Sequence, residues 1–141
     1  MCDTNRMPLS SSDRIAAVIV THKRRDLLAN SLHIVASQTL APEWVVVVDN
    51  GNEPEVKDLV ESVCADSPTS PTPVYLPSRH NLGGAGGFAY GFLTALALGA
   101  DAIFCADDDG RPENTEVLAT LMRVAEQHGL EEVSPVVAGI E

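Results

Sequence analysis

The sequence predicts an α/β fold built on a doubly wound, mostly parallel sheet. Short apolar runs alternate four times with segments of helical periodicity, which is the pattern of repeated strand–helix units. The candidate strands are continuous apolar runs rather than alternating ones, as expected when both faces of a parallel strand are buried. With 141 residues, 45% of them hydrophobic, the chain is long enough for one such core.

The first strand and helix follow a polar segment. Residues 1–13 contain no apolar run and are expected to form a disordered lead-in. Residues 14–20 (RIAAVIV) are rich in β-branched side chains and are predicted to form a buried strand. Residues 21–39 are predicted to contain a helix with Asp26 as its N-cap. Apolar residues recur along this helix at helical spacing: Leu28, Leu32 and Val35.

A second strand and helix follow the same plan. Residues 44–49 (WVVVVD) are predicted to form a buried strand. Residues 50–65 begin with a turn and continue as a helix with Pro54 at its first position, where no amide proton is needed. One side of this helix is apolar: Val56, Leu59, Val60 and Val63. Residues 66–73 (DSPTSPTP) are predicted to form a surface loop.

A glycine-rich segment lies between the third and fourth predicted strands. Residues 74–77 (VYLP) are read as a short strand. Residues 78–99 give a polar loop, a glycine cluster and then an apolar helix. Residues 101–109 (DAIFCADDD) are predicted to form the fourth strand, which ends in three acids.

The last predicted elements are a helix and a fifth strand. Residues 111–129 are predicted to contain a helix that ends at Gly129, a residue suited to the left-handed conformation of a C-cap. Its apolar face is formed by four residues: Leu118, Leu121, Met122 and Ala125. Residues 133–139 (VSPVVAG) are predicted to form the fifth strand.

Charge and cysteine content restrict the possible partners. The chain has 9 Lys and Arg against 20 Asp and Glu, a formal charge of -11, so nucleic acid is not expected as a partner. The cysteines are scattered and form no C-x-x-C pair, which argues against a disulfide framework or a zinc site: Cys2, Cys64 and Cys105. A reducing, cytosolic setting is expected. We interpret Cys105 as a packing residue and His128 as a surface residue.

Polar side chains follow each of the first four predicted strands. They are Thr21, His22, Arg24, Arg25, Asp49, Asn50, Asn81, Asp107, Asp108 and Asp109. The carboxyl ends of parallel strands meet at one edge of the sheet, and ligands bind there, near the topological switch point. The sequence therefore predicts a binding site at this edge.

The three consecutive acids predict a cation. Two carboxylates about 4 Å apart repel by about 4 kcal/mol at an effective dielectric near 20, so water or a cation must relieve them. In an extended segment Asp107 and Asp109 face the same side and could hold a hard ion such as Mg²⁺ or Mn²⁺, completed by substrate phosphates. The alternative is that one acid caps the next helix and the others are solvated.

The glycines allow three interpretations. Four of them cluster at the start of a predicted helix, where backbone amides favour anions: Gly83, Gly84, Gly86 and Gly87. They could instead permit tight helix–strand packing. Gly84, Gly86 and Ala89 also match a G-x-G-x-x-A dinucleotide motif, with Asp107 about twenty residues on. However, the polar segment SRHN separates these glycines from the strand, and a dinucleotide site needs only one acid.

Two further pairs of neighbouring residues could have either a binding role or a structural role. Arg24 and Arg25, beside Lys23, could hold a diphosphate or a base edge, or could be a solvated helix start. Asp49 and Asn50 could bind a base or a sugar hydroxyl, or could belong to an Asn-Gly turn.

Four blocks, in this order, resemble the nucleotide-sugar half of family 2 glycosyltransferases with the GT-A fold: VIVTHKRRDLL, VVVVDNGN, NLGGAGGFAYG and FCADDDG. NLGGAGG together with the triple Asp most resembles the galactofuranosyltransferases that initiate cell-wall galactan. The resemblance covers residues 14–140. It implies a Rossmann-like GT-A fold in which residues 14–141 are the nucleotide-sugar-binding part of an incomplete catalytic domain.

The resemblance implies a role for each matched position. Thr21 and Arg24 would line the uridine pocket. Asp49 and Asn50 would contact the uracil or ribose. The border of the donor site would be formed by Asn81 and Gly83. The metal, Mn²⁺ or Mg²⁺, would be held by Asp107 and Asp109, and Asp108 would complete the acidic loop.

The implied activity is metal-dependent, inverting transfer from a UDP-sugar, with UDP-galactofuranose as the expected donor. The implied acceptor is a rhamnosyl-GlcNAc-diphosphate polyprenol, which places the protein in the cytoplasm at the inner face of the plasma membrane. The catalytic base is expected beyond Glu141. This chain alone is therefore expected to bind donor without turnover and to self-associate through uncovered apolar surface.

Three alternatives remain at this point. The chain could be a non-catalytic nucleotide-sugar-binding module, because no residue in it stands out as a base. It could be a rhamnosyltransferase that uses dTDP-rhamnose, since such enzymes carry similar glycine loops. It could also be a dinucleotide-binding domain, for which a preference for NAD over UDP would be the distinguishing observation.

Overall fold

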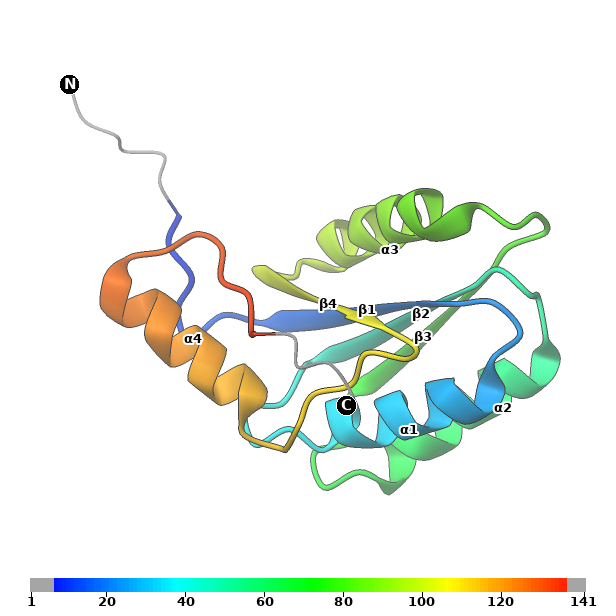
Figure 1. Ribbon diagram of the computed structural model, residues 1–141, viewed down its shortest axis with the longest axis horizontal. Helices are drawn as coiled ribbons and strands as arrows, with labels where there is room; N and C mark the ends of the chain where they lie inside the picture. The colour runs from blue at the N-terminus through cyan, green and yellow to red at the C-terminus, as the bar shows by residue number, and fades with distance from the viewer. Residues whose placement is uncertain (1–6, 137–141) are drawn as a thin grey trace.

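The computed structural model describes residues 7–136 and confirms the alternation of strands and helices (Figure 1). Its elements, in chain order, are β1 (Ile15–Thr21), α1 (Arg25–Ala36), β2 (Trp44–Asp49), α2 (Pro54–Asp66), β3 (Thr72–Pro77), α3 (Gly83–Leu98), β4 (Ala102–Asp107) and α4 (Val117–His128). The strands form one parallel sheet in the order β3-β2-β1-β4, so β1 and β2 are central.

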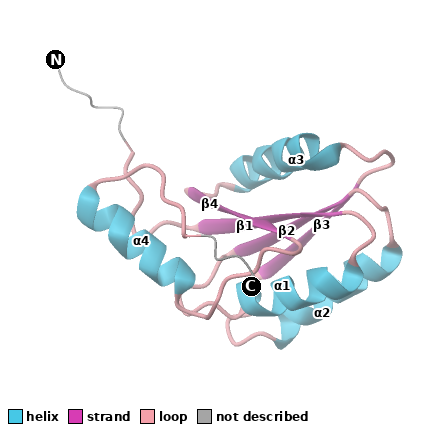
Figure 2. Ribbon diagram, in the orientation of Figure 1, coloured by secondary structure: helices cyan, strands magenta, loops and turns pink. Residues whose placement is uncertain are grey.

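The order of the strands explains the layers. The chain moves from β1 to β2 to β3 in one direction, with α1 and α2 on one face of the sheet (Figure 2). It then returns past β1 to add β4 on the other side, and α3 crosses the opposite face (Figure 1). Because crossovers between parallel strands are right-handed, this reversal of direction puts the helices on both faces. The topological switch point lies between β1 and β4.

The two central strands form the core. Ala16 to Ile19 in β1 and Val45 to Val48 in β2 are fully buried. Side chains of β1 and β2 that point to one face pack against α1 and α2, and those that point to the other face pack against α3. Burial of each large apolar side chain contributes roughly 1.5–3 kcal/mol, which explains why the sequence reads as continuous apolar runs here.

Two glycines let α3 lie unusually close to the sheet. A Cβ atom added at Gly91 would lie 2.3 Å from Val18 Cγ1, and one added at Gly87 would lie 2.6 Å from Val20 Cγ1. Any side chain at these positions would push the helix away from β1. Tight helix–strand packing, one of the three interpretations of the glycine cluster, therefore accounts for Gly87.

Two of three predictions about helix ends are confirmed. Pro54 is the first residue of α2, and Gly129 ends α4 with a φ of 62°. The prediction that Asp26 is an N-cap is wrong, because α1 begins at Arg25 and Asp26 lies within its first turn. Lys23 has a φ of 53°, and this turn brings Arg24 rather than Asp26 to the cap position.

Residues 7–13 of the expected lead-in make specific contacts with the end of α4 and the loop after it. The Leu9 amide donates a hydrogen bond to the Leu130 carbonyl oxygen at 2.7 Å, and the Ser10 hydroxyl donates one to Glu126 at 3.2 Å. Residues 7–13 thus differ from the disorder expected for 1–13, because the loop after α4 and the helix itself supply partners. Residues 1–6 lie outside the described part of the chain.

The described part of the predicted fifth strand, residues 133–136, does not form a strand. Residues 137–139 lie outside the described residues. Pro135 cannot donate a ladder hydrogen bond, and Val136 is 95% exposed. β3, in contrast, begins at Thr72 and includes Pro73, which an edge strand tolerates.

β4 is an edge strand with an open face. Cys105 in β4 is exposed, so the prediction that it packs in the core is wrong; α3 lies mainly over β1 and β2 instead. α3 also exposes Leu93 and Leu96, while His128 is exposed as predicted. Among the described helices, none combines the length and the apolar character needed to cross a bilayer.

We predict that Gly91→Ala lowers the free energy of unfolding by about 1–3 kcal/mol, because the new methyl group would collide with Val18. Gly84→Ala is the matched control, since a Cβ there meets nothing within 4 Å. The control should be neutral or more stable by up to about 1 kcal/mol. Chemical denaturation measures both, and equal stability of the two variants would contradict the close packing.

Candidate functional site

The carboxyl ends of all four strands lie at the same edge of the sheet. In the strand register Thr21 pairs with Asp49, Asp49 pairs with Pro77, and Val20 pairs with Asp107. Every residue predicted for the site lies at the end of one of these strands, in the loop that follows it, or at the first position of the next helix. The structure thus brings together Thr21 and Asp107 at the switch point between β1 and β4, as the topology requires.

Asp108 is the buried centre of this edge. Its side chain is 1% exposed, and Oδ2 accepts hydrogen bonds from Thr21 Oγ1 at 2.9 Å and from Arg24 Nε at 3.0 Å. Arg24 Nη2 also lies 2.7 Å from Oδ1 as an ion pair. The Ser31 hydroxyl donates to the Asp108 carbonyl oxygen at 2.8 Å. Asp108 therefore joins the loop after β4 to the loop after β1 through its own side chain.

The other two acids remain exposed. Asp109 Oδ2 lies 3.4 Å from Arg24 Nη1, and the Asp109 side chain is 54% exposed. Asp107 ends β4, so Asp109 lies beyond the strand, and the alternation expected across residues 101–109 stops at Asp107. The positive charge of Arg24 thus lies beside two of the three carboxylates, Asp108 and Asp109. It relieves part of the repulsion expected among the three acids.

The carboxylate oxygens of Asp107 and Asp109 are suitable ligands for a hard divalent cation. Two exposed carboxylates suit Mg²⁺ or Mn²⁺ when waters and phosphate oxygens complete the coordination sphere. Within residues 7–136, no three His, Cys, Asp or Glu side chains are grouped in a way that could hold a metal ion. Ligation by Asp107 and Asp109 remains a prediction.

Asp49 uses its carboxylate inside the protein. It is fully buried: Oδ1 accepts the Gly51 amide at 2.9 Å, and Oδ2 accepts the Glu53 amide at 2.8 Å. The Tyr75 hydroxyl lies 2.6 Å from the same Oδ2. These contacts are those of a turn at the sequence DNGN, which was the structural role considered for Asp49 as an alternative to ligand binding. Contact between Asp49 and a base or ribose stays a prediction.

Asn50 links the end of β2 to the start of α3. Its Oδ1 accepts the Leu82 amide at 3.1 Å, and its Nδ2 donates to the Gly83 carbonyl oxygen at 3.2 Å. The side chain is nearly buried, at 6% exposure. The amide group of Asn50 therefore fixes the glycine segment relative to β2.

The first turn of α3 is open. Gly83 has a φ of +71°, and the Asn81 side-chain oxygen accepts its amide at 2.9 Å. A Cβ added at Gly83 or Gly84 would meet nothing within 4 Å. The glycine cluster thus divides into an open part at the helix N-terminus and a packed part at Gly87. Backbone amides at a helix N-terminus favour anions.

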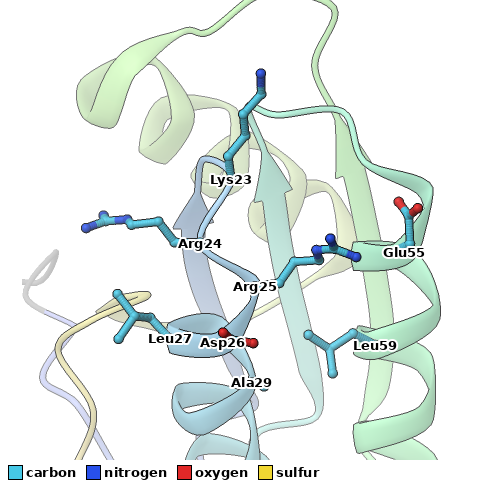
Figure 3. A pocket seen from close by; sticks show the side chains of 8 residues that line it. All are labelled: Lys23, Arg24, Arg25, Asp26, Leu27, Ala29, Glu55 and Leu59. Carbon is cyan, nitrogen blue, oxygen red and sulfur yellow. The ribbon is translucent and has the colours of Figure 1, made fainter.

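A groove of about 760 Å³ lies beside this edge, between the starts of α1 and α2 (Figure 3). Its lining is Lys23, Arg24, Arg25, Asp26, Leu27, Ala29, Glu55 and Leu59. Arg25 extends towards α2, and its Nε lies 3.8 Å from Glu53 Oε2 (Figure 3). Arg24 is the residue that the groove shares with the acids. The groove does not include the α3 glycines, so the candidate site is wider than this one hollow.

Two contributing residues were not predicted from the sequence. Tyr75 lies in a short edge strand, and no residue pattern in the sequence marks its contact with Asp49. Ser31 lies inside α1, where nothing in the sequence marks it.

Comparison with known proteins identifies relatives of this chain. The model of glycosyl transferase family 2 matches residues 16–140. Galactofuranosyltransferase GlfT1 of Mycolicibacterium smegmatis is 52% identical over 134 residues, and that of Mycobacterium tuberculosis is 50% identical over 133. These matches cover 94% and 92% of this chain, which spans only about two fifths of each relative: 42% and 41%.

A solved structure shares the fold. It is the mannosyltransferase PcManGT of Pyrobaculum calidifontis, in complex with GDP-Man and Mn²⁺. The TM-score is 0.60 with 19% sequence identity, over 79% of this chain and 32% of that one. The doubly wound parallel sheet is therefore the Rossmann-like arrangement of GT-A proteins, as predicted.

We predict that Arg24→Gln lowers the free energy of unfolding by about 1–3 kcal/mol, because it leaves the buried Asp108 carboxylate without its cation. Arg25→Gln is the matched control. Its partner lies at 3.8 Å and Arg25 is half exposed, so the loss should stay under about 1 kcal/mol. Urea denaturation at neutral pH distinguishes the two. A larger loss in the Arg25 variant would contradict the central role of Asp108.

We also predict that Tyr75 ionises well above its ordinary pKa of about 10. Burial raises this pKa first, followed by the hydrogen bond to Asp49 and the charges of Asp49, Glu53 and Glu55. The unfolded chain ionises first, so the stabilisation is complete below about pH 10 and is lost as the pH rises further. The tyrosinate absorbance of wild type minus that of Tyr75→Phe isolates this group. Ionisation at or below about pH 10 would contradict the contact.

Proposed function

The chain belongs to glycosyl transferase family 2, and we propose that it binds a nucleotide-diphosphate sugar at the carboxyl edge of its sheet. One observation carries the proposal: the open N-terminus of α3 at Gly83 and Gly84 and the exposed Asp107 and Asp109 lie at the same edge. The first can receive phosphate oxygens, and the second can receive a cation. A diphosphate with a divalent ion needs both.

The nucleotide is proposed to be uridine diphosphate. Thr21 and Arg24 border the uridine, and both are held in place by Asp108. Asn81 and Gly83 border the sugar diphosphate at the start of α3. Asp49 and Asn50 are proposed to contact the uracil or ribose, from a loop that their own hydrogen bonds to the Gly51 and Leu82 amides hold in place.

Asp107 and Asp109 are proposed to hold Mn²⁺ or Mg²⁺. Support comes from their exposure and from the mannosyltransferase of the same fold, which is described in complex with GDP-Man and Mn²⁺. When bound, such an ion would supply a positive charge that offsets the charge developing on the departing diphosphate. Arg24 provides a second, permanent positive charge beside Asp109.

The transferred sugar is proposed to be galactofuranose, delivered to a polyprenol-diphosphate-linked glycan in cell-wall galactan synthesis. About 50% identity to galactofuranosyltransferases over most of this chain supports the donor. The acceptor and a position at the inner face of the membrane follow from the family resemblance alone. The general base for the acceptor hydroxyl is assigned to no residue of this chain.

Calorimetry with UDP tests the proposal. We expect UDP to bind more tightly with Mn²⁺ than without it, and NAD to leave the UDP isotherm unchanged. Tighter binding of NAD than of UDP would favour the dinucleotide alternative. Tighter binding of dTDP than of UDP would favour a rhamnosyltransferase.

We predict that Asp109→Asn weakens Mn²⁺-dependent UDP binding at least about tenfold, which is roughly 1.4 kcal/mol of lost interaction. Asp58→Asn on the exposed side of α2 removes one negative charge elsewhere and should leave the affinity unchanged. Far-UV circular dichroism checks that both variants are folded. Unchanged metal-dependent affinity in folded Asp109→Asn would show that Asp109 holds no metal.

A further inference from the structure

Tyr75 bridges the two ends of the loop between β2 and α2. Its hydroxyl lies 2.6 Å from Asp49 Oδ2, at the end of β2, and 3.1 Å from the Glu53 carbonyl oxygen, just before α2. A phenol has one proton, so it donates to one of these acceptors at a time. Either contact ties the loop to the edge strand β3, which carries none of the proposed donor contacts.

The Asp49 carboxylate, which accepts the Tyr75 hydrogen bond, is not accessible to water. Asp49 is fully buried, and its two oxygens also accept the Gly51 and Glu53 amides. Loss of the Tyr75 hydroxyl would leave Oδ2 with the Glu53 amide alone in a dry site. A buried carboxylate oxygen that loses a hydrogen-bond partner is left partly unsatisfied, which is unfavourable, so the loop would have to rearrange around it.

The same loop touches two other loops of the site. Asn50 binds the Leu82 amide and the Gly83 carbonyl oxygen, so it sets the position of the α3 start. A Cβ added at Gly51 would lie 3.0 Å from Lys23 Cγ and 3.2 Å from the Lys23 backbone nitrogen, so the loop also lies close against the segment before α1. A shift at Asp49 would thus reach both sides of the donor site.

We propose that Tyr75 is a positioning residue of the donor site, which acts through Asp49 and Asn50 on the start of α3. The inference rests on the proposed function for the identity of the ligand. It does not rest on that function for the loop geometry. Tyr75 touches no donor atom in this proposal.

The first arm of the test needs no ligand. Tyr75→Phe keeps the ring and removes only the hydroxyl, and Tyr90→Phe on α3 is the matched control. Amide hydrogen exchange of the intact chain should quicken about tenfold at Gly51, Glu53 and Leu82 in Tyr75→Phe. The amides of β1 and the control variant should be unchanged. General quickening across β1, or no change at Leu82, would overturn the proposed linkage.

The second arm measures UDP affinity with Mn²⁺ at a temperature where both variants are folded. We expect the dissociation constant to rise about threefold to tenfold in Tyr75→Phe and to stay constant in Tyr90→Phe. Quickened exchange with unchanged affinity would show that the bridge holds the loop without positioning the donor, which overturns the proposal. Failure of the wild type to bind UDP would refute the proposed function instead. The exchange arm would then decide the role of Tyr75 in the loop.

Discussion

A carboxylate almost without contact to water lies at the switch point of the sheet, and the arrangement of the site depends on it. An isolated buried charge is strongly unfavourable, so Asp108 requires the Arg24 guanidinium and the Thr21 hydroxyl close by. These contacts join the loop after β4 to the loop after β1. Arg24 is thereby held at the edge, beside Asp109, where a charged ligand would arrive.

In the other loops, too, polar side chains form hydrogen bonds within the protein. Polar side chains that look available in the sequence are engaged within the protein, as with Asp49 in its turn and Asn50 against the start of α3. What stays open is mostly backbone and carboxylate: the first turn of α3 at Gly83 and the exposed acids Asp107 and Asp109. The internal contacts hold the loops in place, and the open groups lie at the edge where a nucleotide diphosphate is proposed to bind.

The strands and their order along the chain can be predicted from the sequence, but the side-chain hydrogen bonds of the site cannot. Continuous apolar runs identify β1 and β2 because central parallel strands are buried on both faces. At the edges the pattern fails: Pro135 lies within the predicted fifth strand, and Cys105 is exposed because α3 lies mainly over β1 and β2. The strand ends correctly predict where the polar residues meet. Whether Asp49 binds a ligand or a turn depends on backbone amides and on Tyr75, which no residue pattern reveals.

In the proposed function, the edge between β1, β4 and the start of α3 receives the donor. The most direct test is a titration of ¹⁵N-labelled protein with UDP and Mg²⁺, with every amide signal followed by NMR. We predict that the largest shifts occur at Thr21, Gly83, Gly84 and residues 107–109, with small shifts in α4. Shifts concentrated in α4 or at the outer side of α3, with none at the glycines, would contradict the claim.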